Sequence, residues 1–78
     1  MTNIEKYKAV FCENLQLAED LLPNLKYQDV PLWDSVGHMT LVAALEDAFD
    51  IMLETDDIIN LSSYEKGKEI LNKYDVIV

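Results

Sequence analysis

Hydrophobic residues recur at helical spacing near the start of the chain. From Ile4 to Leu15 they follow one another at intervals of three and four residues, which places them on one side of a helix. Just ahead, Thr2 and Glu5 fit the capping-box pattern, in which each side chain accepts a hydrogen bond from an exposed backbone N–H. We therefore predict a first helix that ends near residue 14 or 15 and buries one stripe.

Two apolar stripes lie on nearly opposite sides of a second predicted helix, which runs from Ser35 to about Phe49. The heavier stripe, which we predict to face the core, consists of Leu41, Leu45, Ala48 and Phe49. The lighter stripe, which we predict to meet solvent, consists of Val36, Met39 and Ala43. The acids that project beside the lighter stripe are Glu46, Asp47 and Asp50. The alternative is a helix that loops bury on both sides.

The last part of the chain predicts one short helix and one longer helix. Thr55 is a candidate cap for a short helix over residues 56–60, which carries Ile58 and Ile59. Ser62 is the first residue of a second capping-box match, which starts the last helix. The inner stripe of this last helix is predicted to consist of Tyr64, Ile70, Leu71 and Tyr74.

Two features after residue 65 modify the picture of the last helix. Gly67 lies inside it and is expected to weaken it by about 1 kcal/mol. The segment 75–78 is a short apolar tail, either packed on the bundle or frayed.

The segment from Gln16 to Trp33 contains both prolines and has no sustained periodicity. Residues 17–22 form a candidate helical turn, which Pro23 is expected to end. Trp33 is interpreted as a loop aromatic that covers the core. The residues expected to hold this long connection in place are Leu22, Leu25, Tyr27 and Val30. The prediction is an all-α fold in one domain over residues 1–78: an irregular bundle of three main helices plus a short third helix, with a long first loop.

The charge of the chain limits the classes of partner. Six lysines and no arginine stand against 15 acids, which gives a net charge of −9. No lysine lies between Lys26 and Lys66, whereas nine acids do. Nucleic acid and anionic membranes would be repelled. The acidic surface is explained either by ordinary solubility or by docking of basic partners.

The sequence also indicates a compartment. Cys12 is the one cysteine, so no intramolecular disulfide forms and a reducing cytoplasmic location is expected. No apolar run approaches the roughly 18 residues that a membrane span needs. The first residues lack the pattern of a signal peptide, and we expect a monomer without membrane insertion.

Ser35 stands at the predicted start of the second helix. The first turn of a helix leaves backbone N–H groups unpaired and carries partial positive charge, so a phosphate ester on this hydroxyl would be stabilised. The alternative is that Asp34 or Ser35 is simply the residue that caps the helix, since both types are favoured there.

The tripeptide Asp34-Ser35-Val36, followed by a helix that contains the segment Leu41–Phe49, resembles the motif of the acyl carrier protein family. The resemblance extends from Ile4 to about Tyr74. In that family, the serine of an Asp-Ser-hydrophobic motif at the start of the second helix carries a 4′-phosphopantetheine arm. The resemblance therefore implies that Ser35 is the attachment point and that Asp34 is the motif acid beside it.

The same resemblance implies a discrete carrier rather than an enzyme. A phosphopantetheinyl transferase, which holds magnesium in its own active site, would move the arm from coenzyme A to Ser35. The terminal thiol would then hold acyl groups as thioesters for fatty-acid, polyketide or related specialised biosynthesis. Acyl-loading, elongating or transferring enzymes with basic docking surfaces are the other expected partners. The residues expected to contact partners or the acyl chain are Val36, Met39, Ala43, Glu46, Asp47 and Ile58.

Three residues depart from the commonest fatty-acid carriers. Trp33 stands where many carriers have glycine, and Gly37 and Thr40 occupy positions that often bear acids. These departures favour a specialised pathway. An aminoacyl carrier of the D-alanyl or peptidyl type is therefore the alternative within the family, and an unmodified acidic helical adaptor is the alternative outside it.

Two other kinds of site are not supported by the sequence. Asp34, Ser35 and His38 invite comparison with a hydrolase triad, but their spacing on one helix does not bring the side chains together, and His38 is interpreted as a packing residue. The acidic run lacks the glycine turn and spacing of a calcium loop, so we expect no metal site there; its residues are Asp47, Asp50, Glu54, Asp56 and Asp57.

Overall fold

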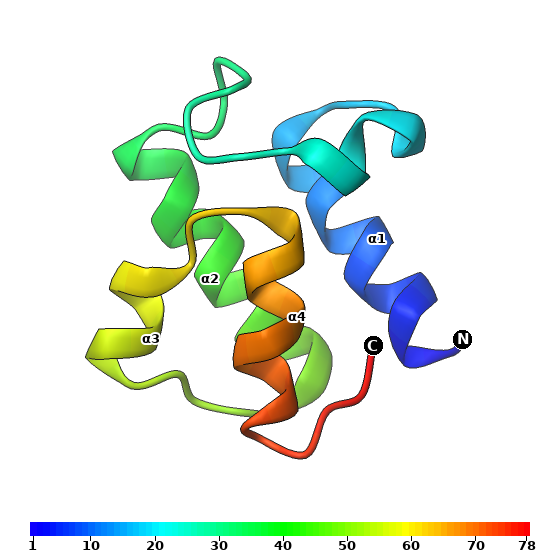
Figure 1. The fold of residues 1–78 in the computed structure, drawn as a ribbon, viewed down its shortest axis with the longest axis vertical. Coiled ribbons are helices and arrows are strands. Elements are labelled where there is room, and N and C mark those ends of the chain that lie inside the picture. The colour runs from blue at the N-terminus through cyan, green and yellow to red at the C-terminus, as the bar shows by residue number, and fades with distance from the viewer.

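The protein is built from five helical segments, which a computed structural model describes over all residues from Met1 to Val78 (Figure 1). They are α1 (Asn3–Leu15), the 3₁₀ helix η1 (Glu19–Asn24), α2 (Ser35–Phe49), α3 (Thr55–Asn60) and α4 (Tyr64–Asn72). The predicted all-α bundle of three main helices plus a short third helix is confirmed.

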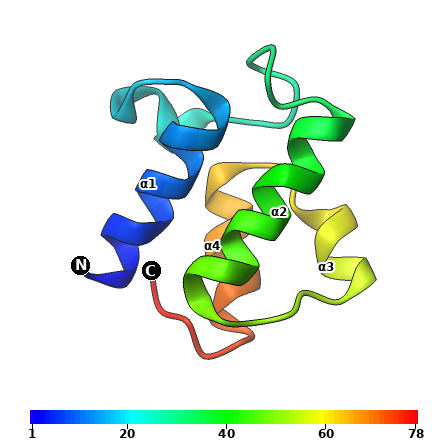
Figure 2. The ribbon, with the colours of Figure 1, turned by 180° about the vertical axis from the view of Figure 1, so that it is seen from behind.

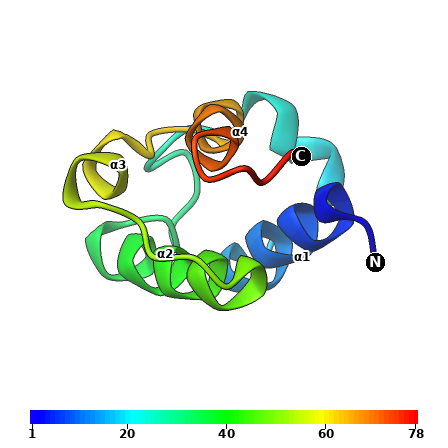
Figure 3. The same ribbon diagram turned by 90° about the horizontal axis from the view of Figure 1, so that it is seen from below.

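The helices form two layers. Seen along the edge of the molecule, α1 and α2 make one layer, and α3 and α4 make the other (Figure 3). Both termini lie on the side away from α3, and the view from behind shows the same arrangement (Figures 1 and 2). The start of α2 and the whole of α3 lie together on the opposite side of the molecule (Figure 1).

Helix α1 follows the prediction from its capping residues to its last turn. The Thr2 hydroxyl accepts a hydrogen bond from the Glu5 N–H, and the Glu5 carboxylate accepts one from the Thr2 N–H at 3.1 Å. The helix ends where Gln16 adopts a left-handed conformation with φ of 52°. Its buried residues are Tyr7, Val10, Phe11 and Leu15.

Trp33 is buried in the core, which agrees with its interpretation as a loop aromatic that covers the core. Its side chain has 0% of its surface exposed, and the Phe11 ring meets it edge-on with 5.6 Å between ring centroids. Phe11 also contacts Tyr7 and Tyr64, with centroid distances of 4.9 and 5.2 Å. Aromatic rings bury the largest areas of any side chains, so this cluster contributes strongly to the stability of a small bundle.

The long first loop is held in place by its side chains and by its backbone. Leu22 and Leu25 are buried, while Tyr27 and Val30 are half-buried. The Tyr27 N–H donates to the Ser62 carbonyl at 2.9 Å, and the Tyr64 N–H donates to the Leu25 carbonyl at 3.0 Å. These bonds join the loop to the connection between α3 and α4.

The helical turn in this loop lies two residues later than predicted. Pro23 was expected to end it but lies inside η1. The Leu21 N–H donates to the Ala18 carbonyl, and the Leu25 N–H donates to the Leu22 carbonyl. Neither bond needs a donor from Pro23, so the missing N–H of the proline does not end the 3₁₀ helix.

The two predicted caps in the second half of the chain are wrong by one residue. Glu54, rather than Thr55, occupies the capping position of α3, and no side chain caps that helix. Ser63, rather than Ser62, caps α4 by accepting a hydrogen bond from the Lys66 N–H at 2.9 Å. The Ser62 carbonyl is already bonded to the first loop, which fixes the backbone one residue before the cap.

Helix α4 buries Tyr64, Ile70 and Leu71, as predicted. Tyr74, the fourth residue of the predicted stripe, lies beyond the end of the helix and is half-buried. Val76 is buried, so the apolar tail packs on the bundle. Gly67 is buried as well, against the Tyr7 side chain.

Candidate functional site

The start of α2 presents Ser35 to solvent without using its hydroxyl as the cap. The capping residue is Asp34, whose Oδ1 accepts a hydrogen bond from the Gly37 N–H at 2.8 Å. Ser35 is the first residue of the helix, and it is exposed. The sequence left the capping role open between Asp34 and Ser35, and the structure assigns it to Asp34.

The environment of Ser35 favours an anion. Helix α2 has 15 residues, and its unpaired N–H groups and aligned peptide dipoles concentrate partial positive charge around its first turn. No acidic side chain lies within that first turn, because Asp34 precedes it. A phosphodiester on the Ser35 oxygen would therefore lie where a helix stabilises negative charge.

Gly37 allows the preceding loop to pass close to the helix. A Cβ atom at this position would lie 1.7 Å from the Leu32 carbonyl oxygen, which no side chain can accommodate without movement of the backbone. This contact gives a physical reason for glycine at this position. It also fixes the loop that leads into Asp34 and Ser35.

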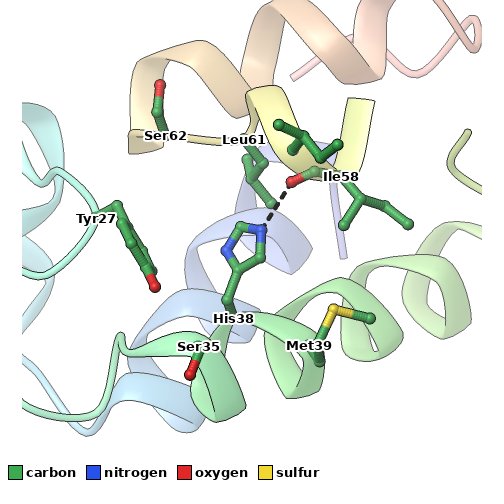
Figure 4. Close-up of a pocket in the computed structure, with 8 residues that line it drawn as sticks. Tyr27, Ser35, His38, Met39, Ile58, Leu61 and Ser62 are labelled. Carbon is green, nitrogen blue, oxygen red and sulfur yellow. Dashed lines mark hydrogen bonds between the residues drawn. The ribbon is translucent and has the colours of Figure 1, made fainter. Parts of the chain in front are cut away.

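A cavity of about 440 Å³ lies beside Ser35, between α2 and α3 (Figure 4). It is lined by Tyr27 from the first loop, Ser35, His38 and Met39 from α2, Ile58 and Ile59 from α3, and Leu61 and Ser62 beyond it. We call this space the Ser35 cavity. Five of its eight lining residues are hydrophobic, so it fits an apolar group better than a charged one.

His38 has a hydrogen-bond partner for each ring nitrogen. The indole Nε1–H of Trp33 donates to Nδ1 at 3.0 Å. An indole nitrogen is a donor only, so Nδ1 must be the acceptor and Nε2 must carry the proton. Nε2 then donates to the Ile58 carbonyl at 2.7 Å (Figure 4).

These two bonds confirm that His38 is a packing residue with satisfied nitrogens. No ring nitrogen is left to accept a proton from Ser35, and an oxygen of Asp34 is engaged at the helix cap. The arrangement lacks the serine–histidine–carboxylate chain that a hydrolase triad requires.

The lighter stripe of α2 faces solvent, as predicted. Val36 and Met39 are 74% and 54% exposed, and Ala43 is also exposed. Of these three, Met39 also lines the Ser35 cavity, where it lies across from the predicted contact residue Ile58. The heavier stripe faces inward through Leu41 and Leu45, with Ala48 and Phe49 half-buried; the sequence did not predict the buried Val42.

The two predicted docking acids of α2 differ in their surroundings. Asp47 is exposed. Glu46 is half-buried, and its Oε2 accepts a hydrogen bond from the Leu53 N–H at 2.9 Å. Glu46 therefore holds the loop that follows α2, while the Asp47 side chain extends into solvent.

Asp57 forms a polar attachment that the sequence did not predict. The residue is 3% exposed, and its carboxylate accepts hydrogen bonds from the Lys73 ammonium and from the Tyr74 hydroxyl, the latter at 2.5 Å. Lys73, and then Tyr74, hold the pKa of the Asp57 carboxyl below its ordinary value. The Tyr74 hydroxyl in turn accepts a hydrogen bond from the Glu54 N–H at 2.9 Å.

No sequence signal marks Asp57, since 16 residues separate it from Lys73 and both side chains look like ordinary surface charges. The attachment joins α3 to the end of α4. No three histidine, cysteine or acidic side chains come together in a way that could hold a metal ion.

Comparisons with known proteins add no family assignment. No protein-family model matches the chain, and no curated protein sequence or solved structure is significantly similar to it. None of the helices is sufficiently long and apolar to cross a membrane.

Proposed function

We propose that this chain is a discrete carrier protein that holds acyl groups as thioesters on a 4′-phosphopantetheine arm attached to Ser35. One observation carries the proposal: an exposed serine begins α2, its neighbour Asp34 supplies the helix cap, and an apolar cavity opens beside it. The resemblance of Asp34-Ser35-Val36 and the following helix to acyl carrier proteins supplies the identity of the arm.

The attachment is a phosphoryl transfer to the serine oxygen. Ser35 Oγ attacks the β-phosphorus of coenzyme A, the bond from that phosphorus to the bridging oxygen breaks, and 3′,5′-ADP leaves. The hydroxyl proton passes to a base of the transferase, where magnesium is also held. This chain contributes an accessible hydroxyl and a helix N-terminus that stabilises the phosphodiester product.

The bound arm then gives the carrier its physical role. A tether confines the terminal thiol near its partner enzymes, which raises its local concentration. The Ser35 cavity offers an acyl chain contact with Met39, Ile58 and Ile59. The carrier itself catalyses no step.

Partner docking is proposed for the exposed side of α2. Val36, Met39 and Ala43 form a small apolar strip, and Asp47 lies beside it as an exposed acid. A partner enzyme with a basic surface would be oriented by charge and released quickly, because the apolar area is small. Glu46 contributes charge to this surface while it holds Leu53.

The test is the mass of the intact protein before and after incubation with coenzyme A, magnesium and a broad-specificity phosphopantetheinyl transferase. We expect a gain of one phosphopantetheine in the wild type and none in Ser35→Ala. Ser62→Ala is the matched control, because Ser62 is also exposed and lines the same cavity but does not begin a helix. It should be modified like the wild type.

A folded wild type that gains no mass beside an active transferase would disprove the carrier. The exposed strip of α2 would then support an unmodified acidic adaptor. If the arm is attached, loading with acyl or aminoacyl groups by candidate ligases distinguishes an acyl carrier from an aminoacyl carrier.

A further inference from the structure

A single hydrogen bond joins α2 to α3 at the Ser35 cavity. It runs from His38 Nε2 to the Ile58 carbonyl over 2.7 Å, and both residues line the cavity. In Figure 4, the His38 ring rises from α2 toward α3, with Tyr27 on one side and Met39 and Ile58 on the other. The ring therefore lies within the space that an apolar group entering from Ser35 would use.

The His38 ring is fixed in orientation by the core behind it. Trp33 is fully buried, donates to Nδ1, and lies nearly parallel to the imidazole, with 12° between the ring planes. Tyr27 meets the same ring edge-on at 5.5 Å between centroids. These contacts set both the tautomer and the direction of the Nε2–H, and none of them comes from α3.

Helix α3 depends on such attachments because it is weak by itself. It has six residues, no side chain caps it, and Ile59 is 72% exposed. Helices this short are unstable in isolation. Its two polar attachments come from neighbouring residues: Asp57 binds Lys73 and Tyr74 near the end of α4, and the Ile58 carbonyl binds His38 on α2.

We propose that His38 is a positioning residue that holds α3 at a fixed distance from α2 and thereby sets the size of the Ser35 cavity. Without its bond to Ile58, α3 keeps its attachment to α4 and moves away from α2, which enlarges the cavity. In a carrier, His38 would limit the length of acyl chain that the cavity shelters. That last step rests on the proposed function, whereas the effect on α3 does not.

Two substitutions separate the hydrogen bond from the bulk of the side chain. His38→Leu retains a side chain of similar size but loses both polar contacts. His38→Gln retains an N–H donor for the Ile58 carbonyl and an oxygen that can accept from Trp33. A residue that acts only by filling space would tolerate leucine at least as well as glutamine.

The first measurement is backbone hydrogen exchange in the unmodified protein, resolved by residue. In His38→Leu, amides of residues 57–61 should exchange roughly 3- to 10-fold faster than in the wild type, as expected for the loss of one neutral hydrogen bond. Amides of α1 should change much less, and His38→Gln should restore slow exchange. Equal acceleration in α1 and α3, unchanged exchange in α3, or failure of glutamine to restore it would overturn the proposal.

The second measurement is cavity size, probed in the same unmodified proteins with N-phenyl-1-naphthylamine, a neutral apolar dye. We expect His38→Leu to bind the dye several-fold more tightly than the wild type or His38→Gln, by fluorescence titration. Equal affinity in all three proteins would overturn the link between α3 and the cavity. Neither measurement uses the phosphopantetheine arm. If Ser35 is not modified, the proposed carrier function is disproved, whereas the effect of His38 on α3 and on the cavity can still be tested.

Discussion

At the scale of single residues, Gly67 shows how a missing methyl group permits α4 to pack closely against the Tyr7 side chain of α1. A Cβ atom at this position would lie 2.0 Å from the Tyr7 hydroxyl oxygen and 3.0 Å from a Leu61 methyl carbon. The Tyr7 side chain cannot easily move, because it is fully buried and its hydroxyl donates to the Tyr64 carbonyl at 2.6 Å. The sequence alone predicts only the helix weakening caused by glycine.

We expect Gly67→Ala to destabilise the protein. Alanine would gain about 1 kcal/mol of helix propensity, but overpacking a buried site costs about 1–3 kcal/mol. A net loss of up to about 2 kcal/mol in the free energy of unfolding should appear in urea denaturation. In a Tyr7→Phe background, which lacks the obstructing oxygen, the same substitution should cost less; an equal cost in both backgrounds would contradict the explanation.

Asp57 predicts a specific dependence of stability on pH. The Lys73 ammonium, and secondarily the Tyr74 hydroxyl, lower the pKa of the Asp57 carboxyl from its ordinary value of 3.8. Because the pKa of this carboxyl is lower in the folded state, its stabilising effect is complete above the pKa of the unfolded state. The effect is lost as the pH falls through the pKa of the folded state. The pKa values of Lys73 and Tyr74 are raised from 10.5 and 10.0, so neither group titrates in this range.

The measurement is the difference in unfolding free energy between the wild type and Asp57→Asn. It should favour the wild type, stay constant from about pH 7 to about pH 5, and shrink below about pH 4. Asp56→Asn is the matched control, because Asp56 is the exposed neighbour on the same helix. A difference for Asp57→Asn that does not vary with pH would show that its charge is not what stabilises α3.

At the scale of helices, periodicity predicts α1 and α2 well because each has a long stripe facing a shared core. The predicted ends agree with the structure to within about a residue, and Trp33 is buried as expected. The caps of α3 and α4 are wrong by one residue. Near both caps the backbone bonds to distant segments, since the Glu54 N–H donates to the Tyr74 hydroxyl and the Ser62 carbonyl accepts from the Tyr27 N–H.

The same reason explains what the sequence could not predict at the candidate site. Ser35 and Asp34 are recognisable because motif and helix start are adjacent in the chain. The bond between His38 and Ile58 spans 20 residues, and its formation depends on how α3 packs after the chain has turned back. Neither hydrophobic spacing nor composition carries that information.

The start of α2 gives a prediction that separates two neighbouring residues. Asp34→Ala removes the side chain that accepts the Gly37 N–H and should cost about 1 kcal/mol of stability. Ser35→Ala should change stability by less than about 0.5 kcal/mol, because an exposed serine that does not cap contributes little. Urea denaturation of both variants tests this order, and a larger loss for Ser35→Ala would reverse the assignment of the cap.

At the scale of the whole molecule, the dominant feature is unbalanced negative charge. Three ion pairs form, and they join Lys8 to Glu19, Lys68 to Glu65, and Lys73 to Asp57. The remaining acids have few cationic neighbours, particularly along α2 and α3, where no lysine occurs. Mutual repulsion of these acids works against the compact state.

Salt should therefore stabilise this protein. Raising sodium chloride from about 20 mM to about 200 mM shortens the screening length to less than about 10 Å and weakens the repulsion among exposed acids. The exposed ion pairs lose little, since such pairs contribute about 0–1 kcal/mol. We expect the melting temperature to rise with salt, and calorimetry measures the shift directly.

The variant that tests the cause is Asp47→Asn combined with Asp50→Asn. Both acids are exposed, and removing two negative charges changes the net charge from −9 to −7. Asp50 follows α2 in a left-handed conformation with φ of 53°, which asparagine also tolerates. The double variant should melt at a higher temperature than the wild type at low salt, because it also removes negative charge near the C-terminal end of a helix dipole. Its further gain on adding salt should be smaller; an equal gain would mean that salt acts through something other than screening of this repulsion.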